Sequence, residues 1–207
     1  MTNATTIVTR RPIEATRPDG MGGDEFRGRS TGVIVGAVMG VVWAGSTLGA
    51  LDLAVTVPVL VAGAAVCAAL MAGARRMRRA AAALPATLSA AVDLGRVRSR
   101  FGLVVAGEFA AIAVAVNVLG RSGHPRWIPA VICAVVGLHF VPLARLFKVR
   151  VYDATAVALC GVAAATMIMG VAGAPVALWR LLPGFGAALA LWATSARMLF
   201  TARTEAS

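Results

Sequence analysis

Glu108 is a carboxylate within a long apolar stretch, where Gly107 precedes it and a run rich in alanine and valine follows. An acidic residue near the centre of a membrane-spanning helix costs about 2.5–3.5 kcal/mol on insertion scales, so Glu108 is not expected to face lipid. A positioned carboxyl group can donate or accept a proton. Glu108 is therefore a candidate proton-transfer or substrate-binding residue. The alternative is a protonated, hydrogen-bonded glutamate packed against its neighbours.

His139 lies in a second apolar stretch, between Gly137 and Pro142. Proline cannot donate a backbone hydrogen bond, so Pro142 leaves a carbonyl one turn earlier without its usual partner. We expect this carbonyl, the imidazole and the space beside Gly137 to form a polar cavity. The alternative is a core histidine whose hydrogen bonds are satisfied.

The two residues are expected at the same depth in the membrane. Glu108 follows Gly102 by six residues, about 9 Å at the rise of an α-helix, and His139 precedes Arg145 by the same distance. A short connection between their helices predicts antiparallel neighbours. We therefore expect both side chains to face one cavity open toward the cytoplasm, where they exchange a proton or bind a polar substrate group.

Other chemistry is not indicated. Three isolated cysteines form no CxxC or Cys/His cluster, so we expect neither a metal site nor a disulfide framework. The sequence contains no GxxxxGK[ST], HExxH or GxSxG motif. We expect no cofactor. The composition does not decide whether the protein is an enzyme.

The composition is that of an integral membrane protein. Hydrophobic residues make up 59% of the 207 residues and charged residues only 14%, too few to cover a surface in contact with water. A net charge of +11 would suggest nucleic-acid binding in a soluble protein. Here the positive charges lie in short segments between apolar runs, as in loops against anionic lipid, so we expect the lipid bilayer rather than nucleic acid as partner.

The apolar runs predict an all-α bundle of six transmembrane helices. Residues 32–74 would form one helix about 64 Å long, twice the hydrocarbon core of about 30 Å, so they must fold as a hairpin turning near Asp52. The predicted spans are about 31–49, 53–73, 101–120, 127–146, 152–171 and 181–200.

Polar segments flank these spans. Residues 1–30 are expected to be a disordered leader and 201–207 a short tail. Residues 74–100 are expected to be a basic loop, in which 80–94 could lie on the membrane as an amphipathic helix. Arginines at the span ends are expected to contact lipid headgroups: Arg75, Arg76, Arg78, Arg79 and Arg145.

The distribution of positive charge predicts the topology. Counted together with the adjoining span ends, the leader, the loop 74–100, the loop after the fourth span and the tail carry 5, 7, 3 and 2 Lys or Arg, whereas the opposite side carries 3. Because basic loops remain cytoplasmic, we expect both termini in the cytoplasm and the spans in a bacterial inner membrane.

Gly32, Gly36 and Gly40 form a GxxxGxxxG pattern on one face of the first span. Glycine allows another helix backbone to approach closely, which is a common way for helices to associate in lipid. This face could pack within the chain or form the interface of a homo-oligomer.

The segment around His139 resembles part of a group of small, uncharacterised bacterial multi-pass membrane proteins. The shared features are a Gly-x-His-x-x-Pro pattern in a late helix and a tyrosine opening the next one, here Gly137, His139, Pro142 and Tyr152. The resemblance covers about residues 102–170. It implies a multi-helix bundle and no particular activity.

Three functions remain open from the sequence. The first is a small proton-coupled carrier, in which Glu108 changes protonation as a substrate moves. The second is a membrane-embedded enzyme, such as a cyclase or isomerase of a lipophilic substrate, with Glu108 as general acid. The third is a structural or accessory subunit, in which the glycine face of the first span matters most.

Overall fold

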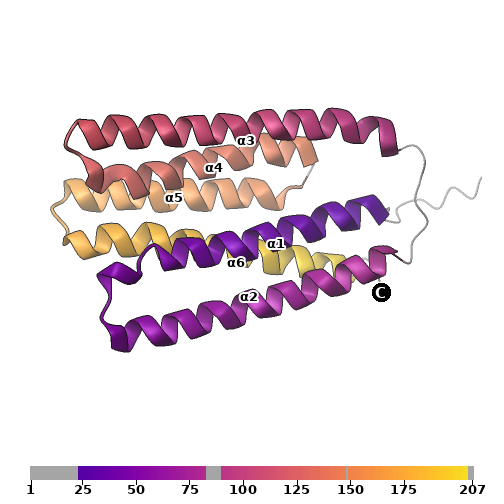
Figure 1. Ribbon diagram of the computed structural model, residues 1–207, viewed down its shortest axis with the longest axis horizontal. Coiled ribbons are helices and arrows are strands. Elements are labelled where there is room, and N and C mark those ends of the chain that lie inside the picture. Colours follow the sequence, from indigo (N-terminus) through magenta and orange to yellow (C-terminus); the bar gives the residue numbers. More distant parts are fainter. Residues whose placement is uncertain (1–22, 83–89, 148, 205–207) are drawn as a thin grey trace, which may run out of the picture.

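The computed structural model describes residues 23–82, 90–147 and 149–204, which form six long α-helices and no strand (Figure 1). Each of the six contains a stretch long and apolar enough to cross a membrane. The predicted all-α bundle of six membrane-spanning helices is therefore confirmed. Two short 3-10 helices, η1 (Leu48–Ala50) and η2 (Pro125–Trp127), lie in connections. The helices are α1 (Gly23–Gly45), α2 (Leu53–Ala82), α3 (Ala90–Arg121), α4 (Ile128–Phe147), α5 (Val151–Val171) and α6 (Val176–Thr204).

The helices run side by side as an open series rather than a closed ring. Packing is most extensive between neighbours in the order α3, α4, α5, α6, α1, α2, and α6 also touches α2 and α4. Figure 1 shows α3 and α2 at opposite edges of the bundle. The start of α1 and the end of α6 lie at the same end of the molecule, as six spans require.

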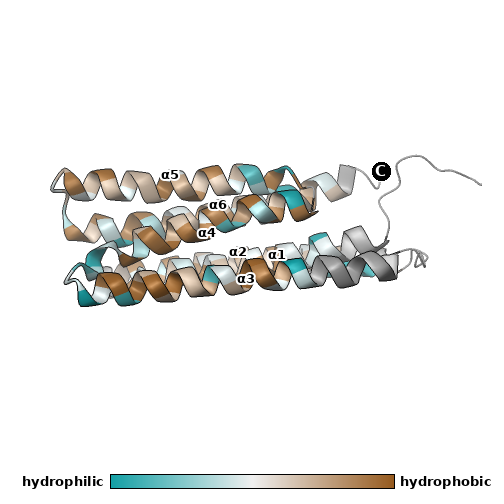
Figure 2. Ribbon diagram, turned by 90° about the horizontal axis from the view of Figure 1, so that it is seen from above, coloured by the Kyte–Doolittle hydropathy of each residue, from teal (hydrophilic) through white to brown (hydrophobic). Residues whose placement is uncertain are grey.

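Hydrophobic side chains cover the middle of the helices, and polar ones gather toward the ends. Figure 2 shows this most clearly on α3, where brown colouring follows a polar end. Large apolar side chains remain exposed along the outer faces, including Leu103, Phe109 and Val157 at 71%, 66% and 74%. Such a surface is stable only where lipid covers it.

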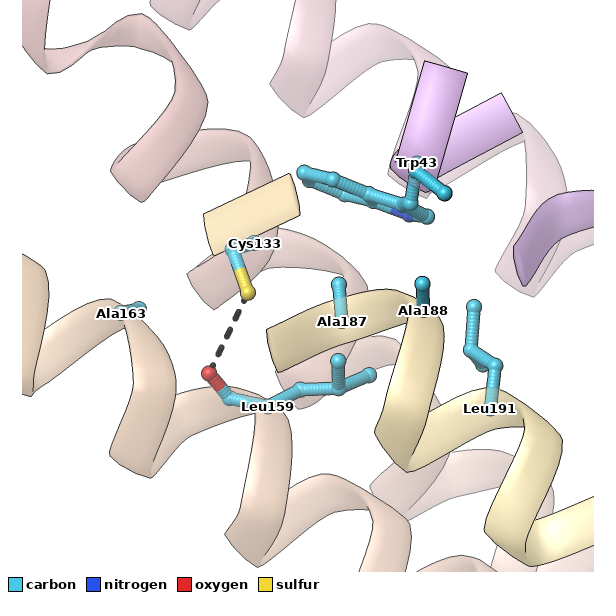
Figure 3. Packing of buried hydrophobic residues seen from close by; sticks show 8 residues of the cluster. Trp43, Cys133, Leu159, Ala163, Ala187, Ala188 and Leu191 are labelled. Atoms are coloured by element: carbon cyan, nitrogen blue, oxygen red, sulfur yellow. Dashed lines mark hydrogen bonds between the residues drawn. The ribbon is translucent and has the colours of Figure 1, made fainter. Parts of the chain in front are cut away.

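Small and apolar side chains fill the centre of the bundle (Figure 3). Trp43 of α1 packs over alanines of α6, and the Cys133 thiol of α4 lies 3.4 Å from the Leu159 carbonyl of α5 as a weak donor. Alanine at these positions lets the helix axes approach closely. The buried members of this core are Trp43, Ala44, Cys133, Leu159, Ala163, Ala187, Ala188 and Leu191.

Three helices extend beyond the predicted spans. Residues 23–30, expected to belong to a disordered leader, form the first turns of α1. Residues 74–82 and 90–100, expected to lie in a basic loop, continue α2 and α3 as helix. Alanine and arginine are strong helix formers, so a helix continues past the apolar residues that fix the membrane-embedded part.

The expected surface helix over 80–94 is therefore wrong at both ends, because residues 80–82 finish α2 and residues 90–94 begin α3. Its centre, residues 83–89, lies outside the described residues. So do residues 1–22 of the expected leader and 205–207 of the tail.

The last helix also starts earlier than predicted, at Val176, so that Pro183 lies inside α6 and is fully buried. The next residue, Gly184, brings α6 against the connection after α1. A Cβ added at Gly184 would collide with Thr47 and lie 3.0 Å from the Trp43 carbonyl. The close approach of the two backbones thus accounts for the small residue at this position.

Candidate functional site

Glu108 lies in α3 with its side chain turned toward α4. The span Ser99–Arg121 has no buried residue, because α3 packs mainly against α4 and η2. Within this exposed helix the Glu108 side chain is only 16% exposed, whereas the next residue, Phe109, is 66% exposed. The carboxyl group therefore lies at the seam between two helices and not in the lipid.

His139 faces Glu108 from α4. The imidazole Nδ1 lies 3.3 Å from the carboxylate Oε2, and the His139 side chain is 10% exposed. The prediction that Glu108 and His139 lie at the same depth, counted from Gly102 and Arg145, thus agrees with the contact between these two ionisable groups. The contact lies within apolar spans, where two such groups are less costly together than apart.

The pair keeps unused hydrogen-bonding capacity. His139 Nδ1 lies within ion-pair distance of Glu108, but it makes no well-aligned hydrogen bond to any described residue. The ring also lies beside the Val104 backbone carbonyl, one turn before Glu108. A neutral imidazole has one donor and one acceptor nitrogen, so it can donate a hydrogen bond to the carboxylate, or accept one, and then the proton, from the protonated carboxyl group. The arrangement can hold a shared proton or a polar group of a ligand.

Two phenylalanines lie between the pair and the arginine-rich end of the bundle, where α2 and α4 end and α3 and α5 begin. Phe101 of α3 and Phe147 of α4 pack edge to face, with ring centroids 6.0 Å apart. They precede Glu108 by seven residues and follow His139 by eight, about 10–12 Å along each helix. The two rings thus lie beyond the pair toward this end of the seam, with Arg145 at an intermediate depth on α4.

Gly137 does not contribute to a polar cavity with His139, and this prediction is wrong. A Cβ at Gly137 would lie 2.8 Å from the Cys160 sulfur and 3.0 Å from the Cys160 backbone nitrogen of α5. Residues two apart on a helix point to nearly opposite sides, so Gly137 faces α5 while His139 faces α3. The glycine serves the close packing of α4 on α5.

The glycine pattern of α1 lies against other helices of the same chain. A Cβ at Gly32 would meet the Tyr152 hydroxyl and Met198, one at Gly36 would meet Ser195, and one at Gly40 would meet Trp192. Trp192 also donates a hydrogen bond from Nε1 to the Ala37 carbonyl at 3.2 Å. This face is thus covered mainly by α6.

The arginines chosen as headgroup contacts lie exposed at one end of the bundle. One of them also has partners within the protein. Arg78 donates hydrogen bonds to Ser30 at 3.3 Å and Thr31 at 3.4 Å, which tie α2 to α1. Arg75, Arg76, Arg79 and Arg145 are exposed at the ends of α2 and α4.

The structure adds a groove that sequence reasoning missed. It has a volume of about 490 Å³ and lies between α3 and α4. Its residues are alanines, valines and one leucine, as in the rest of the span, so nothing in the sequence marks it. The lining residues are Ala110, Ala111, Val114, Ala115, Val118, Leu119 and Val131.

Among the described residues no group of three or more His, Cys, Asp or Glu side chains is placed to hold a metal ion. Comparison with protein-family models, curated proteins and solved structures finds no match to this chain. The resemblance of the His139 segment to bacterial multi-pass proteins therefore stays a prediction.

Proposed function

We propose that the chain is a small proton-coupled carrier, in which Glu108 and His139 share one proton and exchange it as a solute binds. The observation that carries the proposal is the 3.3 Å approach of Nδ1 to Oε2 between two apolar spans. Ionisable residues inside spans are costly and commonly serve proton or ion pathways. An acid and a base in contact are the minimum needed to link proton exchange to binding.

The position of the pair supports this role. α3 lies at the edge of the bundle and packs mainly against α4, whereas the buried core joins α1, α4, α5 and α6. A shift of α3 along α4 would therefore change access to the pair and leave that core intact. Alternating access requires such relative movement of one part of a bundle against another.

The orientation is part of the same proposal. The arginine-rich end faces the cytoplasm of a bacterial cell and both termini lie there, with the exposed arginines of α2 and α4 against anionic headgroups. Phe101 and Phe147 then stand between the pair and the cytoplasmic end.

The groove beside the pair also favours the second candidate, a membrane enzyme acting on a lipophilic substrate with Glu108 as general acid. A substrate diffusing in the bilayer could reach the carboxyl group without entering water. The third candidate, an accessory subunit held by the glycines of α1, has less support, because other helices of the chain already cover this face.

Flux measurements in liposomes test the carrier. Purified protein is reconstituted with a pH-sensitive dye inside, and gradients of small amines, sugars, amino acids and organic cations are imposed one at a time. We expect at least one solute gradient to drive proton movement in the wild type and in Glu108→Asp. The same gradient should drive none in Glu108→Gln or His139→Gln, since the shared proton is lost.

Asp52→Asn is the matched control, because it removes one carboxylate at an exposed helix end. It should retain the full flux. Equal flux in the wild type and in Glu108→Gln would overturn the proposal. The proposal would also be overturned if none of the tested solute gradients drove proton movement in the wild type. Chemical conversion of a lipophilic solute by the wild type would instead support the enzyme.

A further inference from the structure

The groove begins one helical turn from Glu108 and runs away from the arginine-rich end. Ala111 follows Glu108 by three residues, about 4.5 Å along α3, and Leu119 by eleven, about 16 Å. On α4, Val131 precedes His139 by two turns. Because the two helices are antiparallel, the groove and the pair form one continuous strip along their seam. This direction is opposite to the expected cavity, which was to open toward the cytoplasm.

The groove suits an apolar body of small-molecule size. Its seven lining side chains are all hydrocarbon, and the groove is shallow and open along its side, with a volume of about 490 Å³, so an apolar body can lie against it. Val114 and Val118 on its wall are 62% and 59% exposed on the lipid side. A molecule dissolved in the bilayer could therefore enter sideways.

The polar end of the strip favours positive charge. The ionisable residues of the two helices near this seam are His139 and Arg145 on α4, Arg126 in η2, and Arg100 and Arg121 at the ends of the α3 span. Cys133 instead lies against the Leu159 carbonyl of α5, and the Tyr152 hydroxyl lies beside Gly32 of α1. Only His139 among these lies within ion-pair distance of Glu108 in the described structure. An anionic ligand would meet a carboxylate, and a neutral hydrocarbon would leave both polar groups unused.

From these features we infer that the site takes a lipophilic organic cation, whose charge pairs with the Glu108 carboxylate and whose apolar body lies in the α3–α4 groove. The inference rests on the proposed function and names its substrate class. The empty pair holds one shared proton, and the bound site holds the cation in its place, so each cation bound releases one proton. His139 remains neutral and can accept a hydrogen bond from a ligand that has a donor.

Tetraphenylphosphonium is the probe, because its charge is permanent and its body is apolar. Binding to the full chain in lipid nanodiscs is followed by calorimetry, and proton release by a pH indicator in weak buffer. We expect about one proton released per cation, and an affinity that rises up to about tenfold per pH unit while the empty pair is protonated. Triphenylphosphine oxide, a neutral analogue, should release none.

Four variants distinguish the contribution of charge from that of shape. Glu108→Gln should weaken cation binding by about tenfold or more and abolish proton release, since the carboxylate is gone. Ala115→Leu should fill the groove and weaken both probes, whereas Ala106→Leu, exposed elsewhere on α3, should weaken neither. Glu108→Asp retains a carboxylate and should still release a proton, which distinguishes loss of the site from loss of the fold.

Equal cation affinity in the wild type and Glu108→Gln would overturn the inference, and so would binding without proton release. If Ala115→Leu and Ala106→Leu changed the binding of the probes equally, the groove would hold lipid chains instead of the probes. If tetraphenylphosphonium fails to bind while another solute drives Glu108-dependent proton flux, the substrate class is wrong and the carrier stands. If the cation binds and releases a proton but no solute gradient moves protons, the binding site for a cation is supported and the proposed carrier function is wrong.

Discussion

At the scale of single residues, several polar groups of the spans lie in pairs or against backbone carbonyls. These contacts lower the free-energy cost of placing polar groups within lipid. Thr155 bonds Thr194 across α5 and α6 at 2.6 Å, and Ser195 donates to the Leu191 carbonyl of its own helix at 2.8 Å. These hydroxyl groups are therefore satisfied and structural. Glu108 and His139 differ, because they are ionisable and their contact leaves hydrogen-bonding capacity unused.

The coupling between these two residues is measurable as stability. Glu108→Leu or His139→Leu alone leaves a buried polar group without its partner, so each should lower the free energy of unfolding by about 1–3 kcal/mol. The double variant removes both polar groups and should cost about 1–2 kcal/mol less than the sum of the single variants. Unfolding by dodecyl sulfate in mixed micelles, followed by the fluorescence of the four tryptophans, measures each value.

Asn117→Leu is the control for this cycle. Asn117 is exposed and donates to the Ala113 carbonyl of its own helix at 2.9 Å, so its loss should add independently to that of His139. Additive losses for Glu108 and His139 as well would show that the 3.3 Å contact contributes no energy.

At the scale of the helices, the seam between α1 and α6 depends on glycine. The backbone of α1 approaches so closely that the Trp192 ring reaches across it to donate to the Ala37 carbonyl. Val33 and Ala37, which flank the glycines, are fully buried in this seam. Van der Waals packing of this kind is the main attraction between helices in lipid.

Gly36 gives the sharpest test of this seam. A Cβ there would collide with the Ser195 hydroxyl and lie 3.4 Å from the Leu191 carbonyl, so Gly36→Leu should force α1 away from α6. We expect a loss of about 1–3 kcal/mol of unfolding free energy or a strongly reduced folded yield. Gly161→Leu, where an added Cβ meets nothing within 4 Å, should leave both unchanged.

Pairing Gly36→Ala with Ser195→Gly should restore part of the stability lost in Gly36→Ala, because the second change makes room on α6. Failure of this rescue, or a Gly36→Leu protein as stable as Gly161→Leu, would show that α1 and α6 do not pack through this face.

Much of the fold follows from apolar length, and the rest depends on contacts that length does not encode. The predicted spans 127–146 and 152–171 agree with α4 and α5 within one residue at each end, because polar turns bound them closely. The ends of α2 and α3 were missed because hydropathy reports where lipid ends and not where a helix ends. The direction of Gly137 was missed because it depends on how α4 is rotated against α5.

The meeting of Glu108 and His139 followed from counting, since a short connection and a 1.5 Å rise fix which residues of a helical hairpin lie at one depth. The groove could not be found in this way. It arises where alanines of α3 face Val131 across the seam, and its existence depends on the spacing of two helix axes.

At the scale of the whole molecule, the bundle is polarised along its length. The first residues of α1, α3 and α5 and the last residues of α2, α4 and α6 lie at one end, together with most arginines. The opposite end holds the connections η1 and η2 and a cluster in which Arg126 lies 5.7 Å and 5.1 Å from the ring centroids of Trp127 and Trp179. Tryptophan is typical of the membrane interface.

Reporter fusions test the orientation that this polarity predicts. Fusions after Gly49, near Ser122 and near Gly173 should report the external side, because few basic residues surround them. Fusions near Pro85, Lys148 and Ser207 should report the cytoplasm. An external signal from the fusion near Pro85 would contradict both the orientation and the assignment of six spans.

Carboxyl NMR can follow the proton that Glu108 and His139 are proposed to exchange as a pair. The chain has four glutamates, and ¹³C-glutamate labelling in nanodiscs with Glu108→Gln as reference assigns the Glu108 signal. We predict that this signal changes with pH and that His139→Gln alters its pH response, because the two groups hold one proton between them. A signal that does not change with pH, or that responds identically in the wild type and His139→Gln, would show that the two residues do not share a proton.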